Sequence, residues 1–377
     1  MISGQPRTIV LPGYDVRIAP GALDQVAACA ARCTSAHRYV IVSDDIVAPL
    51  YAQRLRAAFG ARAELVTIPS GEEHKTRETW GAVTDRLLAL GAGRDSAIIA
   101  LGGGVVGDLA GFVAATYMRG VPYVQVPTTL LAMVDAAIGG KTGVDTPAGK
   151  NLVGAFHRPA AVIIDPTTLA TLPVHHRRNG AAEAIKHGVI ADAEYFERVC
   201  TFLPTLDTLD GREPELIALI ARSVEIKAEV VREDEREQGG GRRRILNFGH
   251  TLAHAIERET RYAIAHGQAV AIGMVIEARL GEALGVTERG TSERIAGAVR
   301  SAGLADALPA GLDPLAVVRA TREDKKARAG RVEYALPARV GAMASGAGGW
   351  SVPVSDDDVL AALGTPLARS GRDPSHG

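Results

Sequence analysis

Short apolar runs alternate with amphipathic segments through the first half of the chain. The runs at 39–42 and 97–101 contain no charged residue, which is typical of strands buried on both faces of a parallel sheet. The pattern predicts strands at 8–11, 14–18, 39–42, 64–68, 97–101 and 123–126. It predicts helices between them at 21–33, 47–59 and 76–90. This alternation indicates a Rossmann-like α/β fold.

The pattern changes after about residue 175, where helical periodicity replaces the alternation. Amphipathic segments predict helices at 181–190, 195–203, 214–231, 245–258, 267–284 and 292–302. We therefore expect a Rossmann-like parallel-sheet domain over 1–175, a mainly helical domain over 176–365 and a flexible tail over 366–377. Because open parallel sheets bind ligands beyond the carboxyl ends of their strands, the active site is expected in the cleft between the two domains.

Composition excludes several classes of protein. The 42 Lys and Arg residues nearly balance the 43 Asp and Glu residues, which argues against binding of nucleic acid through bulk positive charge. No stretch reaches the roughly 20 uninterrupted apolar residues of a membrane helix, and the N-terminus lacks the pattern of a secretory signal. Three cysteines are too few for a disulfide framework. These features predict a soluble protein in the reducing cytoplasm, without a membrane partner.

Glycine accounts for 42 of 377 residues, about 11% against roughly 7% in average proteins, and part of this excess forms one turn. The predicted strand at 97–101 leads directly into the segment GGGVVGD at 102–108, and a helical stretch follows. Glycines at such a turn expose backbone N–H groups to a pyrophosphate at the positive end of the helix dipole. The spacing is not G-x-G-x-x-G, and a tight structural turn is the alternative. The strand–turn–helix context favours a nucleotide.

Polar residues at the ends of other predicted strands support a nucleotide site. These residues are Asp44, Glu72, Lys75, Thr128 and Thr129. The carboxylates can accept hydrogen bonds from ribose hydroxyls, and the threonine hydroxyls can reach phosphates or a nicotinamide ring. Each residue alone could be an ordinary solvated loop residue. Their recurrence at successive strand ends predicts a dinucleotide site.

The helical half carries histidines with the spacing of metal ligands. His250 and His254 are four residues apart and share one helical face, and His266 begins the next predicted helix. Glu183 lies in another predicted helix. One carboxylate and two imidazoles, with open positions for substrate and water, suit a catalytic zinc. The alternative is a set of hydrogen-bonded histidines without metal, because the helical pair lacks the Glu of H-E-x-x-H.

Several basic residues lie in apolar or glycine-rich surroundings instead of charge runs. They are Arg119, Lys141, Lys150, Lys186, Lys227 and Arg243. Lys and Arg are rarely buried unless they are paired or functional. If these residues converge, the substrate carries phosphate or carboxylate groups. Asp135, shortly before Lys141, either pairs with a lysine or holds a substrate hydroxyl.

Motifs occur along the chain in the order found in one enzyme family. They are GGGVVGD at 102–108, VPTTLL at 126–131, GGKT at 139–142, GKN at 149–151, EAIK at 183–186, LNFGH at 246–250, HG at 266–267 and DKK at 324–326. Together they resemble the 3-dehydroquinate synthases, the shikimate-pathway members of the sugar phosphate cyclases, over roughly residues 8 to 360. The resemblance implies a homodimeric enzyme with NAD and zinc, with cobalt as the alternative metal.

The resemblance implies a role for each matched residue. It implies a metal held by Glu183, His250 and His266. It implies NAD held by Asp44, Glu72, Lys75, Gly104, Val105, Asp108, Thr128, Thr129, Lys141 and Lys150. It implies substrate contacts from Asp135, Lys141, Asn151, Lys186, Lys227, Arg243, Asn247, His254 and one of Lys325 and Lys326, with Lys325 preferred. Arg119 matches a position that reaches the phosphate site of the neighbouring subunit.

The implied reaction converts 3-deoxy-D-arabino-heptulosonate 7-phosphate to 3-dehydroquinate and phosphate. It proceeds by alcohol oxidation, loss of phosphate, re-reduction, ring opening and aldol closure, so that NAD returns unchanged. Zinc would acidify a bound hydroxyl, and the basic residues would stabilise the departing phosphate. Arg243 with Asn247 would hold the carboxylate, and His254 is the candidate for proton transfer.

Three features depart from the family pattern, and other functions remain open. His187 stands where tyrosine is frequent, Gln268 stands where an acid often follows His-Gly, and the loop at 239–241 is extended. The assignment of Arg243 rests on counting back from Asn247. The alternatives are another sugar phosphate cyclase, of the amino-dehydroquinate, inosose or valiolone type, and a metal-dependent alcohol or glycerol dehydrogenase. A non-catalytic nucleotide-binding protein would need neither the zinc nor the lysines.

Overall fold

The computed structural model describes residues 6–234, 241–322, 327–328, 331–346 and 349–364. The chain divides into two compact units. The first comprises Met1–His187 and Glu197–Arg236, and the second comprises Gly188–Phe196 and Glu237–Gly377. The domain boundary near residue 175 stays a prediction.

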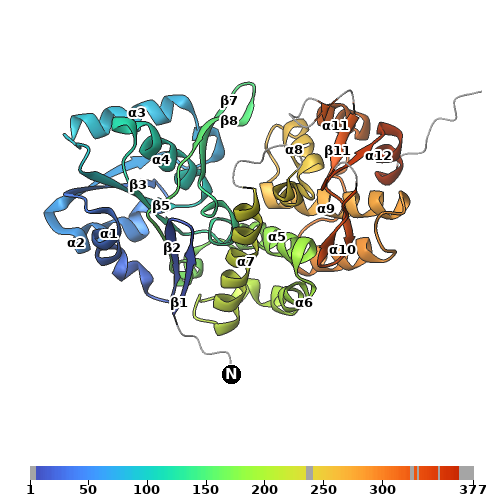
Figure 1. Ribbon diagram of the computed structural model, residues 1–377, viewed down its shortest axis with the longest axis horizontal. Helices are drawn as coiled ribbons and strands as arrows, with labels where there is room; N and C mark the ends of the chain where they lie inside the picture. The colour runs from blue at the N-terminus through green and yellow to red at the C-terminus, as the bar shows by residue number, and fades with distance from the viewer. Residues whose placement is uncertain (1–5, 235–240, 323–326, 329–330, 347–348, 365–377) are drawn as a thin grey trace, which may run out of the picture. The chain divides into compact units, whose positions relative to one another are not determined.

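A seven-stranded sheet organises the first unit (Figure 1). Its strands are β1 (Arg7–Leu11), β2 (Tyr14–Ile18), β3 (Arg38–Asp44), β4 (Ala63–Ile68), β5 (Ser96–Gly102), β6 (Tyr123–Pro127) and β9 (Ala161–Ile164). They are ordered β1-β2-β9-β6-β5-β3-β4; β1 and β2 pair antiparallel, and the other neighbours pair parallel. The predicted Rossmann-like parallel sheet is therefore confirmed, with a hairpin at one edge.

Helices cover both faces of this sheet (Figure 1). They are α1 (Val26–Thr34), α2 (Gln53–Phe59), α3 (Arg77–Ala89) and α4 (Gly104–Thr116). Tyr39 of β3 packs in one core with α1 and α2, whereas its neighbour Val40 packs in another with α3 and α4. Both side chains are buried because neither face of the strand meets water, which explains the uninterrupted apolar run in the sequence.

The first unit contains a hairpin and further helices besides the large sheet. An antiparallel hairpin of β7 (Lys141–Thr146) and β8 (Gly149–Phe156) was not expected. The long helices are α5 (Val174–Ala191), which continues into the second unit, and α7 (Pro214–Glu233); α6 (Ala193–Phe202) crosses the division. Short helical turns are η1 (Ala22–Gln25), η2 (Ala48–Ala52), η3 (Gly60–Arg62), η4 (Glu72–His74), η5 (Tyr117–Arg119), η6 (Ala132–Ala136), η7 (Pro166–Thr171) and η8 (Leu203–Thr208).

The second unit is mainly helical, as predicted. Its helices are α8 (His250–Glu259), α9 (His266–Ala283), α10 (Thr291–Ser301), α11 (Pro314–Arg322) and α12 (Asp356–Ala362), preceded by the 3-10 turn η9 (Arg242–Asn247). Two small sheets that the sequence did not predict are formed by β10 (Ala327–Arg328), β11 (Arg331–Tyr334) and β14 (Val352–Val354), and by β12 (Pro337–Arg339) and β13 (Ala342–Met343). The helix predicted over 245–258 is wrong in its first turn, because Gly249 has a left-handed φ of 79° and α8 begins only after it.

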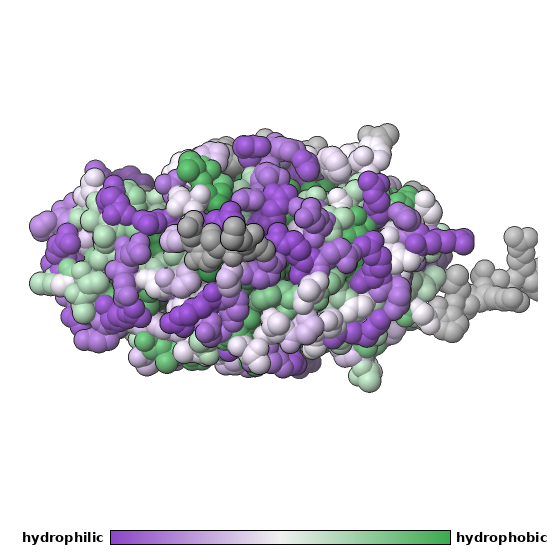
Figure 2. Space-filling view, turned by 90° about the horizontal axis from the view of Figure 1, so that it is seen from below, coloured by the Kyte–Doolittle hydropathy of each residue, from purple (hydrophilic) through white to green (hydrophobic). Residues whose placement is uncertain are grey.

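The surface agrees with a folded chain whose apolar residues fill internal cores. On the face shown in Figure 2, hydrophilic residues predominate, and hydrophobic residues lie among them in small groups. Within the described residues, no helix combines the length and the apolarity needed to cross a membrane.

Candidate active site

The glycine-rich segment of the first unit forms the predicted strand–turn–helix. Strand β5 ends at Gly102 and α4 begins at Gly104. A Cβ on Gly102 would lie 2.6 Å from Cγ2 of Val106, so close packing of the turn on its own helix also requires a glycine here. At the end of the neighbouring strand, the buried hydroxyl of Thr128 has no hydrogen-bond partner among the described residues. A buried hydroxyl in this position suits a polar ligand group.

Asp44 and Thr129, two other residues expected at strand ends, both accept hydrogen bonds from nearby backbone amides. Asp44 is the last residue of β3, and its Oδ1 accepts hydrogen bonds from the amides of Ile46 at 3.0 Å and Val47 at 2.7 Å. Thr129 Oγ1 accepts from the amide of Ala132 at 3.2 Å. Both side chains therefore shape the loops that follow their strands, and the second carboxylate oxygen of Asp44 lies outside these two bonds.

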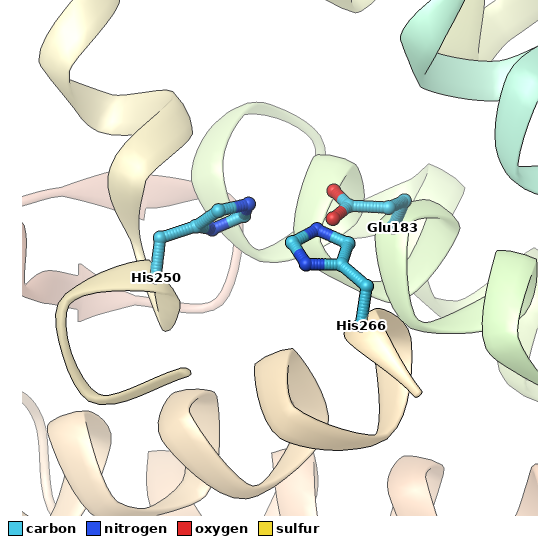
Figure 3. Close-up of side chains that lie close together, drawn as sticks. All are labelled: Glu183, His250 and His266. Atoms are coloured by element: carbon cyan, nitrogen blue, oxygen red, sulfur yellow. The ribbon is translucent and has the colours of Figure 1, made fainter. Parts of the chain in front are cut away.

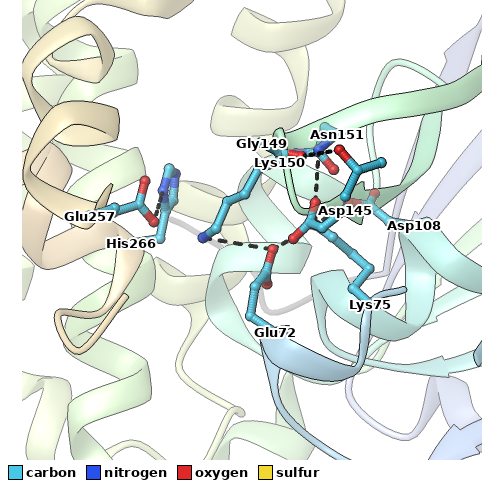
Figure 4. A network of polar contacts seen from close by, with 10 residues as sticks. Glu72, Lys75, Asp108, Asp145, Gly149, Lys150, Asn151, Glu257 and His266 are labelled. Carbon is cyan, nitrogen blue, oxygen red and sulfur yellow. Dashed lines mark hydrogen bonds and ion pairs between the residues drawn. The ribbon is translucent and has the colours of Figure 1, made fainter. Parts of the chain in front are cut away.

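Lys75 is the centre of a charged cluster in the first unit (Figure 4). Its buried Nζ lies 2.7 Å from Glu72 Oε1, 3.4 Å from Asp108 Oδ2 and 3.7 Å from Asp145 Oδ1. Burial alone would lower the pKa of Lys75, but the three carboxylates outweigh it and raise that pKa above its usual value. Burial raises the pKa of Asp108 to about 6 despite the nearby ammonium group. Lys150 Nζ is 3.8 Å from Glu72 Oε1.

Asp145 connects this cluster to the β7–β8 hairpin and was missed by the sequence reasoning. Its backbone amide donates to the carbonyl of Lys75 at 2.7 Å, and its Oδ1 accepts from the amide of Asn151 at 2.8 Å. Asn151 itself has a φ of 53°. The structure thus brings the neighbouring residues Lys150 and Asn151 close to the Glu72–Lys75 turn, which lies far from them along the chain.

Asp135 is the centre of a second buried cluster in the first unit. Its Oδ1 lies 2.9 Å from Lys227 Nζ, 3.4 Å from His187 Nε2 and 3.9 Å from Lys186 Nζ. Lys227 Nζ also donates to the carbonyl of Asp135 at 2.7 Å, and Lys186 pairs with Glu183. Burial by itself raises the pKa of Asp135, but the two ammonium groups and His187 together hold it well below its ordinary range. Two carboxylates and two ammonium groups make the cluster electrically balanced.

In the second unit, His250 and His266 are the first residues of α8 and α9 (Figure 3). Their ring centroids are 5.3 Å apart. His250 Nδ1 lies 3.1 Å from the carbonyl oxygen of Phe248, and His266 Nδ1 lies 3.5 Å from Oε1 of the buried Glu257 (Figure 4). An Nδ1–H directed at an oxygen leaves the lone pair on Nε2, which is the form of imidazole that binds a metal.

The remaining predicted metal and proton-transfer residues lie on the same helices or on α5. His254 is one turn along α8 from His250, with ring centroids 5.6 Å apart, so the shared helical face is confirmed. Glu183 lies near the middle of α5, which begins at Val174, earlier than the helix predicted from residue 181 (Figure 3). Glu183, His250 and His266 offer one carboxylate oxygen and two ring nitrogens, a donor set that suits zinc.

A buried carboxylate fixes the start of α8, and sequence reasoning missed it. Glu277 accepts hydrogen bonds from the amides of Gly249 at 2.6 Å and Leu252 at 3.2 Å. A Cβ on Gly249 would lie 2.6 Å from Met274 Cγ, so α8 can approach α9 this closely only with glycine. Glu277 is an acid inside the apolar helix α9, and the same signal that identified the lysines could have found it. Glu257 carried no comparable signal.

Of the three consecutive arginines, two have other partners in the second unit. Arg242 lies 6.0 Å from the ring centroid of Trp350, and Arg244 pairs with Glu333. Arg243 is 2% exposed, and Asn247 ends the same 3-10 turn. The choice of Arg243 as the substrate-binding arginine stays a prediction. Lys325 and Lys326 lie outside the described residues.

The other predicted residues lie on the surface of the first unit. Lys141 and Arg119 are exposed, and Arg119 has a φ of 69°.

Gln268, in the second unit, donates to the carbonyl of Ala305 at 3.1 Å and accepts from its amide at 3.2 Å. A carboxylate could not make the first of these bonds, so the departure at Gln268 has a structural explanation.

Comparisons with known proteins identify the family of the chain. Residues 65–179 match the family described as 3-dehydroquinate synthase N-terminal, and residues 180–327 match 3-dehydroquinate synthase C-terminal. Over 342 residues the chain is 46% identical to a 3-dehydroquinate synthase from Synechococcus sp., an alignment that covers 88% of this chain and 92% of that protein.

Solved structures of related cyclases share the fold. A 2-deoxy-scyllo-inosose synthase complexed with carbaglucose-6-phosphate, NAD+ and Co2+ is 26% identical, with a TM-score of 0.85 over 95% of this chain and 99% of that one. A 2-epi-5-epi-valiolone synthase from Streptomyces hygroscopicus with NAD+ and Zn2+ bound is 30% identical, with a TM-score of 0.83 over 95% of this chain and 98% of that one. From its sequence matches and its fold, the chain belongs to the 3-dehydroquinate synthase family.

Proposed function

We propose that the chain converts 3-deoxy-D-arabino-heptulosonate 7-phosphate to 3-dehydroquinate and phosphate, with NAD as a recycled cofactor and a divalent metal, zinc or cobalt. The similarity to curated 3-dehydroquinate synthases over 88% of the chain carries this proposal. The related cyclases of known structure hold NAD+ together with Co2+ or Zn2+, which supports the choice of cofactors.

The residues of the first unit fit a dinucleotide. The turn at Gly104 and Val105 would receive the phosphates at the start of α4, and the unpartnered hydroxyl of Thr128 would bond the ligand. The proposed ribose and nicotinamide contacts are Asp44, Glu72, Lys75, Asp108, Thr129, Lys141 and Lys150. The Lys75 cluster supports this role because its carboxylates are already held in place before the cofactor binds.

The proposed metal ligands are Glu183, His250 and His266. A metal held by these residues would supply Lewis-acid chemistry that lowers the pKa of a substrate hydroxyl, and bound NAD+ would supply reversible hydride transfer at the carbon bearing that hydroxyl. Phe248 and Glu257 would hold the two imidazole rings so that each presents Nε2. These two contacts would keep the imidazole rings of His250 and His266 oriented even without the metal.

The remaining residues would bind the substrate through its charges. Asp135 would accept a hydrogen bond from a hydroxyl, with Lys186 and Lys227 beside it. Arg243 and Asn247 would bind the carboxylate, and Lys141, Asn151 and Lys325 would complete the contacts. The ammonium groups would stabilise the departing phosphate electrostatically, and the exposed His254 would exchange protons with water.

We further propose a homodimer in which Arg119 contributes to the partner's site. Arg119 is exposed after α4, and the exposed Leu152, Val153 and Phe156 of the β7–β8 hairpin offer apolar area for a second copy. Light scattering should give twice the chain mass. Mixing inactive Arg119→Ala and inactive Lys186→Ala chains should restore part of the turnover, because a mixed dimer has one intact site; no restoration would contradict a shared site.

The reaction itself has a direct test. Protein supplied with zinc and a catalytic amount of NAD+ should release one phosphate per heptulosonate phosphate without accumulating NADH, measured by a coupled phosphate assay and absorbance. Stoichiometric NADH would instead identify a dehydrogenase. Equal efficiency on a heptulose phosphate without the carboxylate would identify an inosose-type or valiolone-type cyclase, and preference for an amino analogue would identify the amino-dehydroquinate type.

A further inference from the structure

His187 and Ser223 form a buried pair beside Asp135 that the proposed reaction does not use. His187 lies on α5 and Ser223 on α7, and both are 0% exposed. His187 Nδ1 is 2.5 Å from Ser223 Oγ, and its Nε2 is 3.4 Å from Asp135 Oδ1. The imidazole ring therefore lies between a hydroxyl group and the carboxylate that is expected to meet the substrate, and Nε2 approaches this carboxylate without forming a hydrogen bond to any described residue.

The position of the ring proton follows from the partners. Lys227, Lys186 and His187 keep Asp135 ionised, and an ionised carboxylate only accepts hydrogen bonds. A hydrogen on Nε2, the atom facing Asp135, is attracted by this carboxylate, whereas a lone pair on Nε2 would be repelled by it. Nδ1 then has a lone pair, which accepts from the hydroxyl of Ser223.

The charge of the ring is also defined. Burial lowers the pKa of His187; Asp135 acts in the opposite direction and Lys186 adds to the lowering, and the net shift is downward, which favours the neutral ring. The surrounding carboxylates of Asp135 and Glu183 already balance the ammonium groups of Lys186 and Lys227. A protonated ring would add an unbalanced buried charge, which is costly.

The three contacts of the carboxylate fall on the same atom. Lys227, His187 and Lys186 all approach Oδ1 of Asp135 from the helices α5 and α7. Among the described residues, these contacts leave Oδ2 for a further partner. The arrangement fixes the carboxylate by one oxygen and presents the other.

A metal ion is not the partner that this geometry favours. Asp135, Glu183 and His187 could supply three ligand atoms close together. However, the ammonium groups of Lys186 and Lys227 contact the same carboxylate, and they would repel a cation. His187 is better explained as a hydrogen-bond donor.

We propose that His187 is a positioning residue that holds the Asp135 carboxylate for the substrate hydroxyl, and that Ser223 fixes the ring in the tautomer this requires. The inference rests on the proposed function only in giving Asp135 a substrate to bind. The tautomer is a property of the protein alone, and its measurement does not depend on the reaction.

The first test uses two amides as replacements for the ring. His187→Gln places an N–H donor near the position of Nε2, whereas His187→Asn places its amide near Nδ1 and falls short of Asp135. We expect His187→Gln to keep kcat/KM within about threefold of wild type and His187→Asn to lose about tenfold to a hundredfold, since one hydrogen bond to a charged group is lost. Equal losses in the two variants would overturn the positioning role.

The second test reads the tautomer by 15N NMR of the full chain labelled at histidine. The ring signals absent from His187→Gln identify His187, and we expect an Nε2–H, Nδ1-lone-pair pattern in the wild type. Ser223→Ala should give a mixture of tautomers and lower kcat/KM about threefold to tenfold. The control is Ser96→Ala. It removes a buried hydroxyl that, unlike that of Ser223, has no hydrogen-bond partner among the described residues, and it should change neither the tautomer nor kcat/KM. An Nδ1–H tautomer in the wild type would refute the proposal.

The two proposals fail in different ways. If the wild type releases no phosphate from the heptulosonate phosphate, the proposed function is wrong, and the tautomer measurement still stands. If the wild type turns over the substrate but His187→Asn and Ser223→Ala match it, the positioning role of His187 is wrong.

Discussion

The two units hold their polar residues by different physical means. In the first unit, buried charges neutralise one another, as where Lys75 meets three carboxylates and Asp135 meets two lysines. In the second unit, each histidine has a single oxygen near Nδ1: the backbone carbonyl of Phe248 lies 3.1 Å from His250, and Glu257 lies 3.5 Å from His266.

This difference predicts which substitutions reduce folding stability and which reduce ligand binding. Removing one member of a buried charge cluster leaves the others uncompensated, so the fold itself loses stability. Removing the half-exposed imidazole of His250, which contacts a backbone carbonyl, leaves no buried charge unpaired, so the cost falls on the metal that the ring would bind. Substitutions in the first unit should therefore weaken folding, and those around the histidines should weaken metal binding.

The largest expected effect is on metal affinity. His250→Ala should weaken binding of Zn2+ or Co2+ by roughly a thousandfold or more, because a ligand is lost, while the urea midpoint of the metal-free protein stays near wild type. Competition with a chromophoric chelator measures the affinity. His254→Ala is the control and should keep the metal. Wild-type affinity in His250→Ala would show that the ligand set is wrong.

Lys227→Met should reduce folding stability, which His250→Ala should leave almost unchanged. Loss of the buried ammonium group 2.9 Å from Asp135 should lower the free energy of unfolding by about 3 kcal/mol, measured by urea denaturation. The control is Arg319→Met, which removes a cation from an exposed pair with Asp313 and should leave the unfolding midpoint almost unchanged. Similar midpoints for Lys227→Met and wild type would remove the distinction between the two units.

Glu257→Gln tests the orientation of His266. The neutral amide is a weaker acceptor for the Nδ1–H group, so metal affinity should fall about tenfold to a hundredfold with little change in folding. Glu259→Gln makes the same change at an exposed position on the same helix and should bind metal like wild type. If the two variants bind metal equally well, Glu257 does not orient the ligand.

The smallest effect concerns the raised pKa of Asp108, near 6 in the folded state. Its ionisation at higher pH is easier in the unfolded chain, so this group costs stability as pH rises through 6. Between pH 5 and 7 the wild type should lose about 1 kcal/mol more than Asp108→Asn. Urea unfolding at both pH values measures this, with the exposed Asp85→Asn as the control. Parallel pH curves for wild type and Asp108→Asn would argue against the burial effect.

The strands of the large sheet could be predicted because burial on both faces leaves a continuous apolar run, as at Tyr39 and Val40. The β7–β8 hairpin could not, because its strands are rich in glycine and polar residues, and much of β8 is exposed. The early end of the predicted helix before Gly249 depends on close packing against α9, which no local pattern records.

The residues of the candidate site also differ in how far the sequence identifies them. Lys186 and Lys227 were identifiable because a lysine is rarely buried without a function, and Glu277 could have been found in the same way. Glu257 lies in a polar stretch, and its burial depends on the packing of α8 against the rest of the second unit. Asp145 gains its importance from a contact with Lys75, seventy residues earlier in the chain, which only the folded structure reveals.

The link through Asp145 has a thermodynamic consequence. Glu72 and Lys75 are proposed to bind the cofactor, and Asn151 on the hairpin is proposed to bind the substrate. A ligand that shifts the Lys75 cluster also shifts the oxygen that holds the Asn151 amide. Under these assignments the cofactor and substrate sites share one coupling free energy, and each ligand changes the affinity for the other by the same factor.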